Sequence, residues 1–409
     1  MQMNLFDHVL NAYARAEGPV TNDDLYNDVA KSAGISSDDL HKTVEIGDTS
    51  AKTSAIKRTI RWHQQTLKHA GLLERTANRG RWTLTKEGKA KHGLRKAEPK
   101  ATMVAYSTDL GVALWSLSSD VYSALKGDEP ITLCLTSPPY PLRNSRAYGN
   151  VDAAQYTDFI LENLAPIVDN LRPGGSVCLN ISNDIFETGR PSRSLYLEKL
   201  IIAINEELGL ELMHRLCWHN PSKPPSPTQW MAKTRQQLKS NFEPIYWFTN
   251  DAQLCRSNNR RVLQPHTERM KRFIQSGGEQ TSRTGSDGAY AVKPGSYSKP
   301  TEGAVPGNIL RYSHTCKSQL NYKHQARESG LPAHGAPYPL ALAKFLIEFL
   351  TERNDLVVDP FGGSNTTGVG AEELGRRWMV TDCMYEYALG SGGRFERPDW
   401  NDEFLRIAA

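Results

Sequence analysis

Four consecutive residues, Ser137-Pro138-Pro139-Tyr140, bring together a hydroxyl group, two prolines and an aromatic ring. They follow a run of strand-forming residues at 131–136, and the proline pair must end that strand because it lacks backbone N–H groups and fixes φ. What remains is a rigid loop with carbonyl oxygens, a hydroxyl and a ring at the carboxyl end of a strand. Ligands bind at this end in open α/β sheets. We therefore predict a functional site at residues 137–140.

A second stretch, residues 354–382, has the pattern of a nucleotide-binding βαβ unit. Residues 356–358 are predicted to form a buried strand, with Gly362 and Gly363 directly after it. A helix is expected to begin near Thr366, and a further strand leads to Asp382. In such units glycines let a ligand approach the backbone, and a carboxylate after the second strand binds ribose hydroxyls.

The same stretch indicates which cofactor would bind. The spacing of Gly363 and Gly368 matches the two glycines of the P-loop pattern G-x-x-x-x-G-K-S/T. However, Val369-Gly370 stand where that pattern has a lysine and a serine or threonine. The dinucleotide pattern G-x-G-x-x-G is also absent from this turn. A cofactor with a ribose and no phosphate fits better, and S-adenosylmethionine is the common one.

Composition excludes several classes of protein. With 39% apolar and 23% charged residues, the chain of 409 residues is typical of soluble globular proteins of two or three domains. It has neither an apolar run of membrane-spanning length nor a signal-peptide pattern, so we expect a cytoplasmic protein. The scattered cysteines form no C-x-x-C pair, which favours reduced thiols and no metal site (Cys134, Cys178, Cys217, Cys255, Cys316, Cys383).

Charge is concentrated near the N-terminus. Residues 51–100 carry 14 lysines and arginines and only 3 glutamates, although the whole chain has a net charge of +4. Two amphipathic helices, the second capped by Thr21, precede a basic helix, and Asn78-Arg79-Gly80 is the turn of a basic hairpin. This order resembles a winged helix, particularly the N-terminal domains of some restriction-system proteins. The predicted DNA contacts are Lys57, Arg58, Arg61, Arg79 and Arg81. The alternative is a solvated basic helix without a ligand.

The elements that must position these motifs alternate between strands and helices from residue 102 onward. Such alternation predicts an α/β sheet with helices on both faces. A segment at 276–308, rich in glycine, serine and proline, is predicted to be a long loop or mobile arm. The expected domains are a winged-helix-like unit at 1–96, a catalytic domain at 102–219 and 331–395, and a target recognition region at 220–330.

Together, the motifs at 136–140 and 359–368 resemble those of the DNA amino-methyltransferases. Their order, with the catalytic motif before the cofactor motif, is the circularly permuted order of the β group. Three further stretches share the resemblance, "AYGN" at 147–150, "WHNPSKPPSP" at 218–227 and "HGAPYPLALAKF" at 334–345. The resemblance covers roughly residues 102–390 and implies a Rossmann-like, S-adenosylmethionine-dependent methyltransferase fold.

The resemblance also implies the chemistry. The Ser137 hydroxyl and the Pro138 carbonyl would accept hydrogen bonds from an exocyclic amino group of a base, and Pro139 would keep them in place. The base would be flipped out of duplex DNA and stacked on Tyr140. Because no Pro-Cys dipeptide occurs, a covalent mechanism of the C5-cytosine type is not expected, and direct transfer is.

Cofactor contacts are carried over residue by residue. Phe361 would pack on the adenine, Asp382 would hold the ribose, and Asp109 would contact the adenine edge. The methionine part would meet the remaining positions (His334, Pro337, Asp359, Gly362, Gly363, Ser364, Asn365 and Thr366). Ser222 and Lys223 would line the flipped-base pocket or meet phosphate, and a proline-stiffened loop is the alternative.

The function inferred is site-specific methylation of cytosine N4 in double-stranded DNA. N6-adenine methylation by the same fold is the alternative, because serine at the first motif position only favours cytosine. A DNA-binding regulator with an inactive methyltransferase domain is more remote. A cognate restriction endonuclease and a second copy of the chain are the further partners suggested.

Overall fold

The computed structural model describes residues 5–16, 18–46, 51–78, 80–86, 88, 95–125, 127, 130–141, 151–285, 288–335 and 337–407. Its largest part is a sheet built from β6 (Met103–Ser107), β7 (Gly111–Trp115), β8 (Ile131–Thr136), β9 (Leu171–Asn180), β10 (Glu211–His219), β11 (Phe242–Thr249), β14 (Ile309–Arg311), β15 (Leu356–Asp359), β16 (Arg377–Asp382) and β17 (Asp399–Trp400). The ten strands lie in the order β14-β10-β11-β9-β8-β15-β16-β7-β6-β17. The central strands β9, β8, β15, β16 and β7 are parallel, so their carboxyl ends share one edge.

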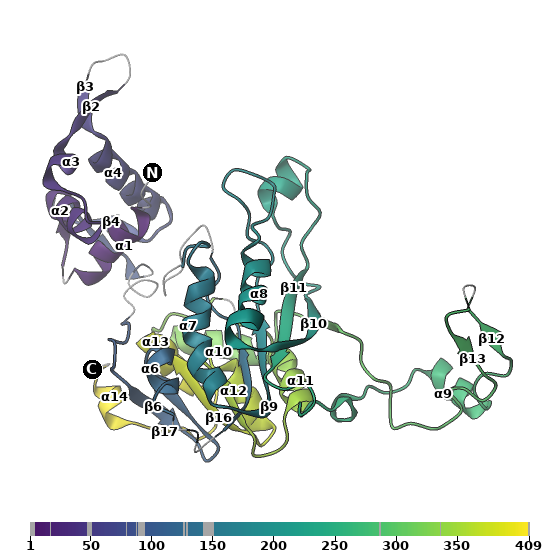
Figure 1. Cartoon of the computed structure of the whole chain (residues 1–409). Helices are drawn as coiled ribbons and strands as arrows, with labels where there is room; N and C mark the ends of the chain where they lie inside the picture. The colour runs from purple at the N-terminus through teal and green to yellow at the C-terminus, as the bar shows by residue number, and fades with distance from the viewer. Residues whose placement is uncertain are drawn as a thin grey trace.

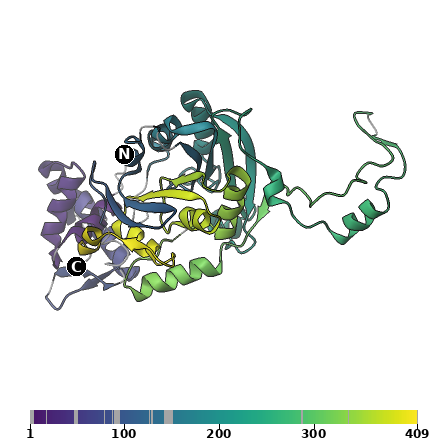
Figure 2. The ribbon, with the colours of Figure 1, turned by 90° about the horizontal axis from the view of Figure 1, so that it is seen from below.

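Helices cover both faces of this sheet (Figures 1 and 2). One face packs on α6 (Ser118–Tyr122), α7 (Tyr156–Asp169) and α8 (Tyr196–Leu208). The other packs on α11 (Leu340–Leu350), α12 (Thr366–Glu373), α13 (Tyr385–Gly392) and α14 (Asp402–Arg406), and α10 (Lys317–Glu328) packs on α13. The predicted α/β architecture is confirmed.

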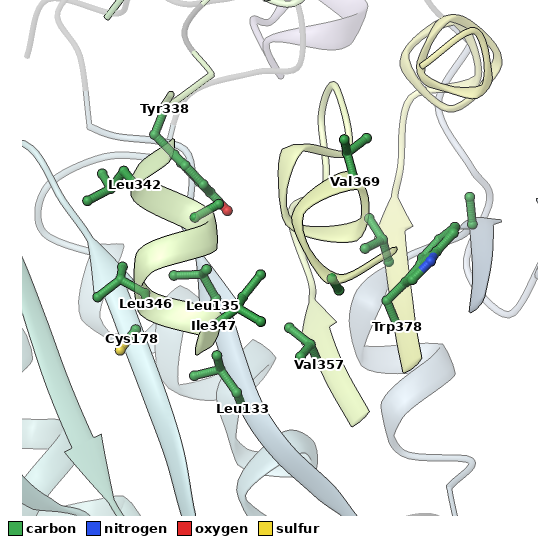
Figure 3. Packing of buried hydrophobic residues seen from close by; sticks show 14 of the residues in the cluster. Leu133, Leu135, Cys178, Tyr338, Leu342, Leu346, Ile347, Val357, Val369 and Trp378 are labelled. Carbon is green, nitrogen blue, oxygen red and sulfur yellow. The ribbon is translucent and has the colours of Figure 1, made fainter. Parts of the chain in front are cut away.

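The side chains of the central strands alternate between two hydrophobic cores. In β15, Leu356 and Val358 face the core under α7, whereas Val357 faces the core under α11. Figure 3 shows this second core, where the side chains of α11 face the strands and Leu346 lies beside Cys178. Strands buried on both faces read as continuous apolar runs, which is why the sequence pattern located them.

The N-terminal unit has a core of its own. It consists of α1 (Phe6–Arg15), β1 (Val20–Thr21), α2 (Asn22–Ser32), α3 (Ser37–His41), β2 (Thr43–Ile46), β3 (Ala51–Ser54), α4 (Ala55–His69), β4 (Leu73–Arg75) and β5 (Arg81–Leu84). Thr21 caps α2 by accepting the Asp24 N–H at 3.2 Å, as predicted. The basic helix is α4, and the predicted hairpin is β4–β5, with Gly80 at φ +86° in its turn. The β2–β3 hairpin between α3 and α4 was not predicted.

A long arm leaves the sheet between β11 and β14 and extends away from the body in both views (Figures 1 and 2). After the short helix η2 (Asn259–Val262), the arm carries α9 (Glu268–Gln275) and the hairpin of β12 (Arg283–Thr284) and β13 (Ala291–Val292). Paired backbone hydrogen bonds between Gln264 and Ala304 close its base. Another short helix, η1 (Thr228–Lys233), lies in the connection between β10 and β11. Among the described residues, no helix is long and apolar enough to cross a membrane.

Candidate active site

A cavity of about 400 Å³ lies at the carboxyl ends of the parallel strands. Its wall is formed by residues 137–140 after β8, residues 116–119 after β7, Phe361 after β15 and Asp382 at the end of β16. Helix α7 adds Phe159, Glu162 and Asn163 from above the sheet, and His334 and Tyr387 complete the far side. The structure therefore joins the two motifs that are distant in sequence in one cavity.

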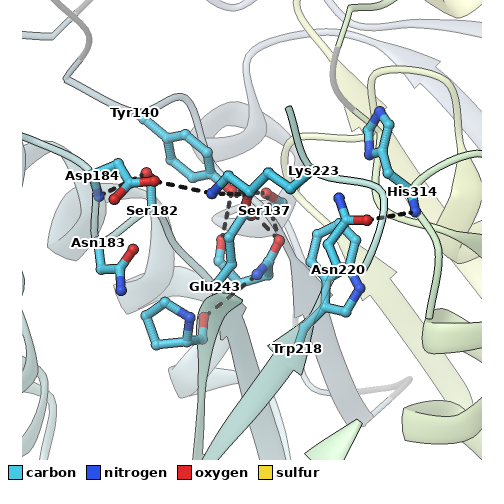
Figure 4. Close-up of polar contacts among 12 residues, drawn as sticks. Ser137, Tyr140, Ser182, Asn183, Asp184, Trp218, Asn220, Lys223, Glu243 and His314 are labelled. Carbon is cyan, nitrogen blue, oxygen red and sulfur yellow. Dashed lines mark hydrogen bonds and ion pairs between the residues drawn. The ribbon is translucent and has the colours of Figure 1, made fainter. Parts of the chain in front are cut away.

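The predicted catalytic loop is held by hydrogen bonds to β9 (Figure 4). The Ser137 hydroxyl lies 2.8 Å from the Tyr140 hydroxyl and donates to Oδ1 of Asn180 at 3.4 Å. The Asn180 amide in turn donates to the Pro244 carbonyl at 3.4 Å, which orients Oδ1 toward Ser137. The Ser137 hydroxyl oxygen has two lone pairs, and even if it accepts the Tyr140 proton it keeps one for an incoming N–H donor.

Behind this loop lies a cluster of ion pairs. The Lys223 ammonium is 3.0 Å from Asp184 and 3.4 Å from Glu243, and Arg193 is 2.8 Å from Asp184. Burial raises the pKa of Glu243, and the charge of Lys223 offsets only part of that rise. Burial alone would raise the pKa of Asp184 too, but Ser240, Arg193 and Lys223 together hold it below its usual value. Lys223 is thus paired with carboxylates and is not an exposed phosphate ligand.

The cofactor motif presents one carboxylate to the cavity. Asp382 accepts the N–H groups of Gly363 and Met384, each at 2.7 Å. Burial is the main reason that its pKa is raised to about 7, and these two hydrogen bonds oppose the rise. Gly363 has φ +52°, and a Cβ there would lie 3.0 Å from the His334 ring, so the turn requires glycine.

Asp359 has a different position from the one the resemblance implies. It is 2% exposed and does not line the cavity. Its carboxylate accepts the hydroxyls of Thr136 and Thr367, both at 2.6 Å, and the Phe361 N–H at 3.0 Å. Burial raises its pKa, and these donors counteract that rise. Asp359 therefore ties the residue before Ser137 to the cofactor loop and leaves no oxygen directed at a ligand.

Of the other predicted cofactor residues, only His334, Phe361 and Asp382 are part of the cavity wall. Ser364, Asn365 and Thr366 are buried behind it, where Asn365 caps α12 by accepting the Gly368 N–H at 2.9 Å. Gly362 packs against Val380, so closely that a Cβ would lie 2.1 Å from it, and Pro337 is buried with its carbonyl bonded to Gln319.

Asp109 is not brought to the site. It is exposed in the turn between β6 and β7, beside Gly111, which pairs with Trp378 at the amino end of β16. Because β6 is the antiparallel partner of β7, the turn after β6 lies at the edge of the sheet opposite to the carboxyl ends of the parallel strands. Residues 116–119, after β7, occupy the position expected of Asp109. The apolar run 111–115 followed by serines was the signal for them.

The predicted DNA contacts of the N-terminal unit lie on its surface. Arg58 and Arg61 are exposed on α4, and Arg81 is exposed on β5. Lys57 is half-buried, with its ammonium 5.2 Å from the centre of the Tyr26 ring. Arg79 and the "AYGN" stretch at 147–150 fall outside the described residues. Ser222 is exposed and bonded to Asn220 and Ser313.

Comparison with known proteins agrees with this geometry. The DNA methylase (N6/N4) family model matches residues 131–390, and the Mrr N-terminal domain model matches residues 3–92. Type II methyltransferase M.PvuII of Proteus hauseri is 35% identical over 292 residues, covering 71% of this chain and 85% of that protein. M.BglII of Bacillus subtilis is 23% identical and covers 68% of each chain. The solved PvuII DNA methyltransferase (cytosine-N4-specific) superimposes with a TM-score of 0.57 at 28% identity, covering 76% of this chain and 94% of that one.

The sequence resemblance and the fold are therefore both confirmed: the chain belongs to the N6/N4 DNA methylase family, and its N-terminal unit is an Mrr N-terminal domain.

Proposed function

We propose that the protein transfers a methyl group from S-adenosylmethionine to the exocyclic N4 of cytosine in double-stranded DNA. The observation that carries the proposal is the single cavity in which residues 137–140 face Phe361 and Asp382. The PvuII relative supports the choice of base, since its solved structure is named cytosine-N4-specific.

The cavity fits the cofactor in size and chemistry. About 400 Å³ is within the roughly 300–1,000 Å³ usual for small-molecule sites. Phe361, 5.6 Å from the Phe159 ring, offers an apolar face for a purine, and Asp382 offers a carboxylate for two ribose hydroxyls. When bound, S-adenosylmethionine supplies an electrophilic methyl group on its sulfonium.

The residues after β8 would activate the amino nitrogen. Ser137 Oγ and the Pro138 carbonyl each accept one N–H of the target, which frees the nitrogen lone pair from the ring. The same acceptors stabilise the positive charge that develops on the nitrogen. A stacked base cannot reach this cavity, so the cytosine must be flipped out, and the Tyr140 ring in the cavity wall would stack on it.

The test uses methyl-labelled S-adenosylmethionine and duplex DNA of mixed sequence, followed by nucleoside mass spectrometry. We expect labelled N4-methylcytosine from the natural protein. Ser137→Ala should lower the rate by about a hundredfold or more, since it removes an acceptor from the transition state, and should leave cofactor affinity unchanged.

Each alternative has its own outcome in this test. Labelled N6-methyladenine alone would reassign the base. Cofactor binding and DNA binding without any methylated nucleoside would support the regulator with an inactive domain.

A further inference from the structure

The segment between the N-terminal unit and the sheet is attached to the cofactor strand. Residues 95–98 run antiparallel to residues 383–386, directly after Asp382. The Ala97 N–H donates to the Cys383 carbonyl at 2.7 Å, and the Tyr385 N–H donates to the Arg95 carbonyl at 2.8 Å. The connection is thus a short added strand on the rim of the cavity.

Side chains anchor this segment on both sides of Lys96. The Arg95 N–H donates to the Glu386 carboxylate at 2.9 Å, and its guanidinium lies 4.9 Å from the centre of the Tyr385 ring. Ala97 is 5% exposed. Lys96 therefore has a fixed backbone, although its own side chain is exposed.

Lys96 belongs to the cavity wall, together with Asp382, Cys383 and residues 116–119. Among the described residues of that wall, it is the only lysine or arginine. Burial raises the pKa of Cys383 to about 12, and the nearby Lys96 charge partly offsets the effect. Because Lys96 pairs with Met384, two residues after Asp382, it lies at the same end of the cavity as the carboxylate assigned to the ribose.

We propose that residues 95–98 form part of the cofactor site, with the Lys96 ammonium donating a hydrogen bond to a ring nitrogen of the adenine. This inference rests on the proposed function, because it takes S-adenosylmethionine as the ligand and Asp382 as its ribose partner. An adenine ring presents nitrogen acceptors at its edge, whereas the positive charges of the cofactor lie in its methionine part. The methionine part also carries a carboxylate, but its sulfonium and ammonium leave it with a net positive charge, so a cation is better suited to the neutral adenosine end.

The proposed contact would also connect the cofactor site to the N-terminal unit. The segment that would touch the cofactor leads directly into the Mrr N-terminal domain. If cofactor binding requires residues 95–98 to lie in one position, any other interaction that holds them there also strengthens cofactor binding. Cofactor binding should therefore hold residues 95–98 against residues 383–386.

The experiment measures affinity for S-adenosylmethionine and for S-adenosylhomocysteine by calorimetry on the full chain. Lys96→Met should weaken binding of both ligands about fivefold to tenfold, and Lys96→Arg should restore most of the loss. Binding of adenosine, which lacks the carboxylate that the two ligands also share, should be weakened by the same factor. Lys100→Met is the matched control: it removes an exposed lysine of the same connection that is not part of the cavity wall, and it should bind like the natural protein.

Three results would decide against the assignment. Natural affinity in Lys96→Met overturns the role of Lys96. A change for S-adenosylmethionine alone would show that Lys96 acts on the sulfonium charge and overturns the adenine contact. If the natural protein bound neither ligand, the proposed function itself would fail.

As an independent measurement, amide exchange at residues 95–98 should slow on adding S-adenosylmethionine. Unchanged exchange would contradict the inference that the cofactor holds residues 95–98 against residues 383–386.

Discussion

At the scale of single residues, Asp382 is the group whose protonation should control cofactor affinity. Its pKa is raised to about 7 by burial, so the carboxyl is largely protonated below that pH when no ligand is present. Only the ionised form accepts hydrogen bonds from both ribose hydroxyls. Affinity should therefore be constant above pH 7 and fall up to about tenfold per unit below it.

Calorimetry between pH 5.5 and 8.5 would measure this dependence, with Asp382→Asn as the comparison. The asparagine variant should bind about tenfold or more weakly at pH 8 and lose the step near pH 7. Unfolding caused by the Asp382 titration cannot explain a loss of affinity below pH 7. Because the pKa of this carboxyl is raised in the folded protein, its protonation makes the unliganded fold more stable as the pH falls from 7 toward 4. A step of the same size in Asp382→Asn would assign the titration to another group.

Residue roles were predictable where a motif requires one side chain in one place. Phe361 and Asp382 follow the ends of buried strands, and both are in the cavity wall. Asp359 also ends a strand, but its carboxylate is used by Thr136 and Thr367. Thr136, which is 223 residues away, supplies one of those donors, and no local pattern indicates that it meets Asp359. Asn180, which orients Ser137, was missed for the same reason.

At the scale of elements, the spacing of apolar residues indicated where the strands are, but not which strands are neighbours in the sheet. The expected strands at 131–136, 176–182 and 356–358 are present as β8, β9 and β15. The turn expected at 172–175 is instead an irregular part of β9, where Gly174 has φ +74° and packs against Leu254. The antiparallel β6–β7 pair is a hairpin of consecutive strands, and the apolar run at 111–115 was the local signal for it and for the place of Asp109. The order of the other strands depends on contacts between residues distant in sequence.

The arm between Gln264 and Ala304 contributes none of its described residues to the two cores of the sheet. Its two ends are paired, and none of the side chains of α9 is fully buried. It also exposes Tyr290 by 70% and Tyr297 by 61%, and such rings can stack on unpaired bases. We expect the arm to contact DNA as part of the target recognition region predicted at 220–330.

Replacing residues 266–302 by a short glycine-serine linker tests this expectation. Thermal stability and S-adenosylmethionine affinity should change little, because the arm adds nothing to either core. Methylation should fall by about a hundredfold, the equivalent of two lost base contacts at roughly 1–3 kcal/mol each. Activity within threefold of the natural protein would place base recognition elsewhere. A loss of cofactor affinity would show that the deletion damaged the fold.

At the scale of the whole molecule, two units with separate cores share one chain. The core of the N-terminal unit draws on residues 5–84, and the two cores of the sheet draw on residues 105–404. The expected boundary at residue 96 falls inside the segment that pairs with residues 383–386, so a cut there would remove part of the cavity wall. The sequence pattern could separate the two expected domains near residues 96–102 but could not indicate what the connection between them packs against. The restriction endonuclease and the homodimer stay predictions.

The charge of the N-terminal unit leads to a prediction about DNA affinity. Arg58, Arg61 and Arg81 are exposed, and α4 and the β4–β5 hairpin carry them. If each neutralises one phosphate, changing all three to glutamine in the full chain should flatten the slope of log affinity against log salt by about 2.7. Affinity should fall most at low salt, and the methylated sequence should stay the same.

Changing Arg353, Arg397 and Arg406 to glutamine removes the same charge from exposed positions of the other unit and is the matched control. Equal slopes in the two triple variants would mean that the basic helix is merely solvated, and that the Mrr N-terminal domain serves a purpose other than holding DNA.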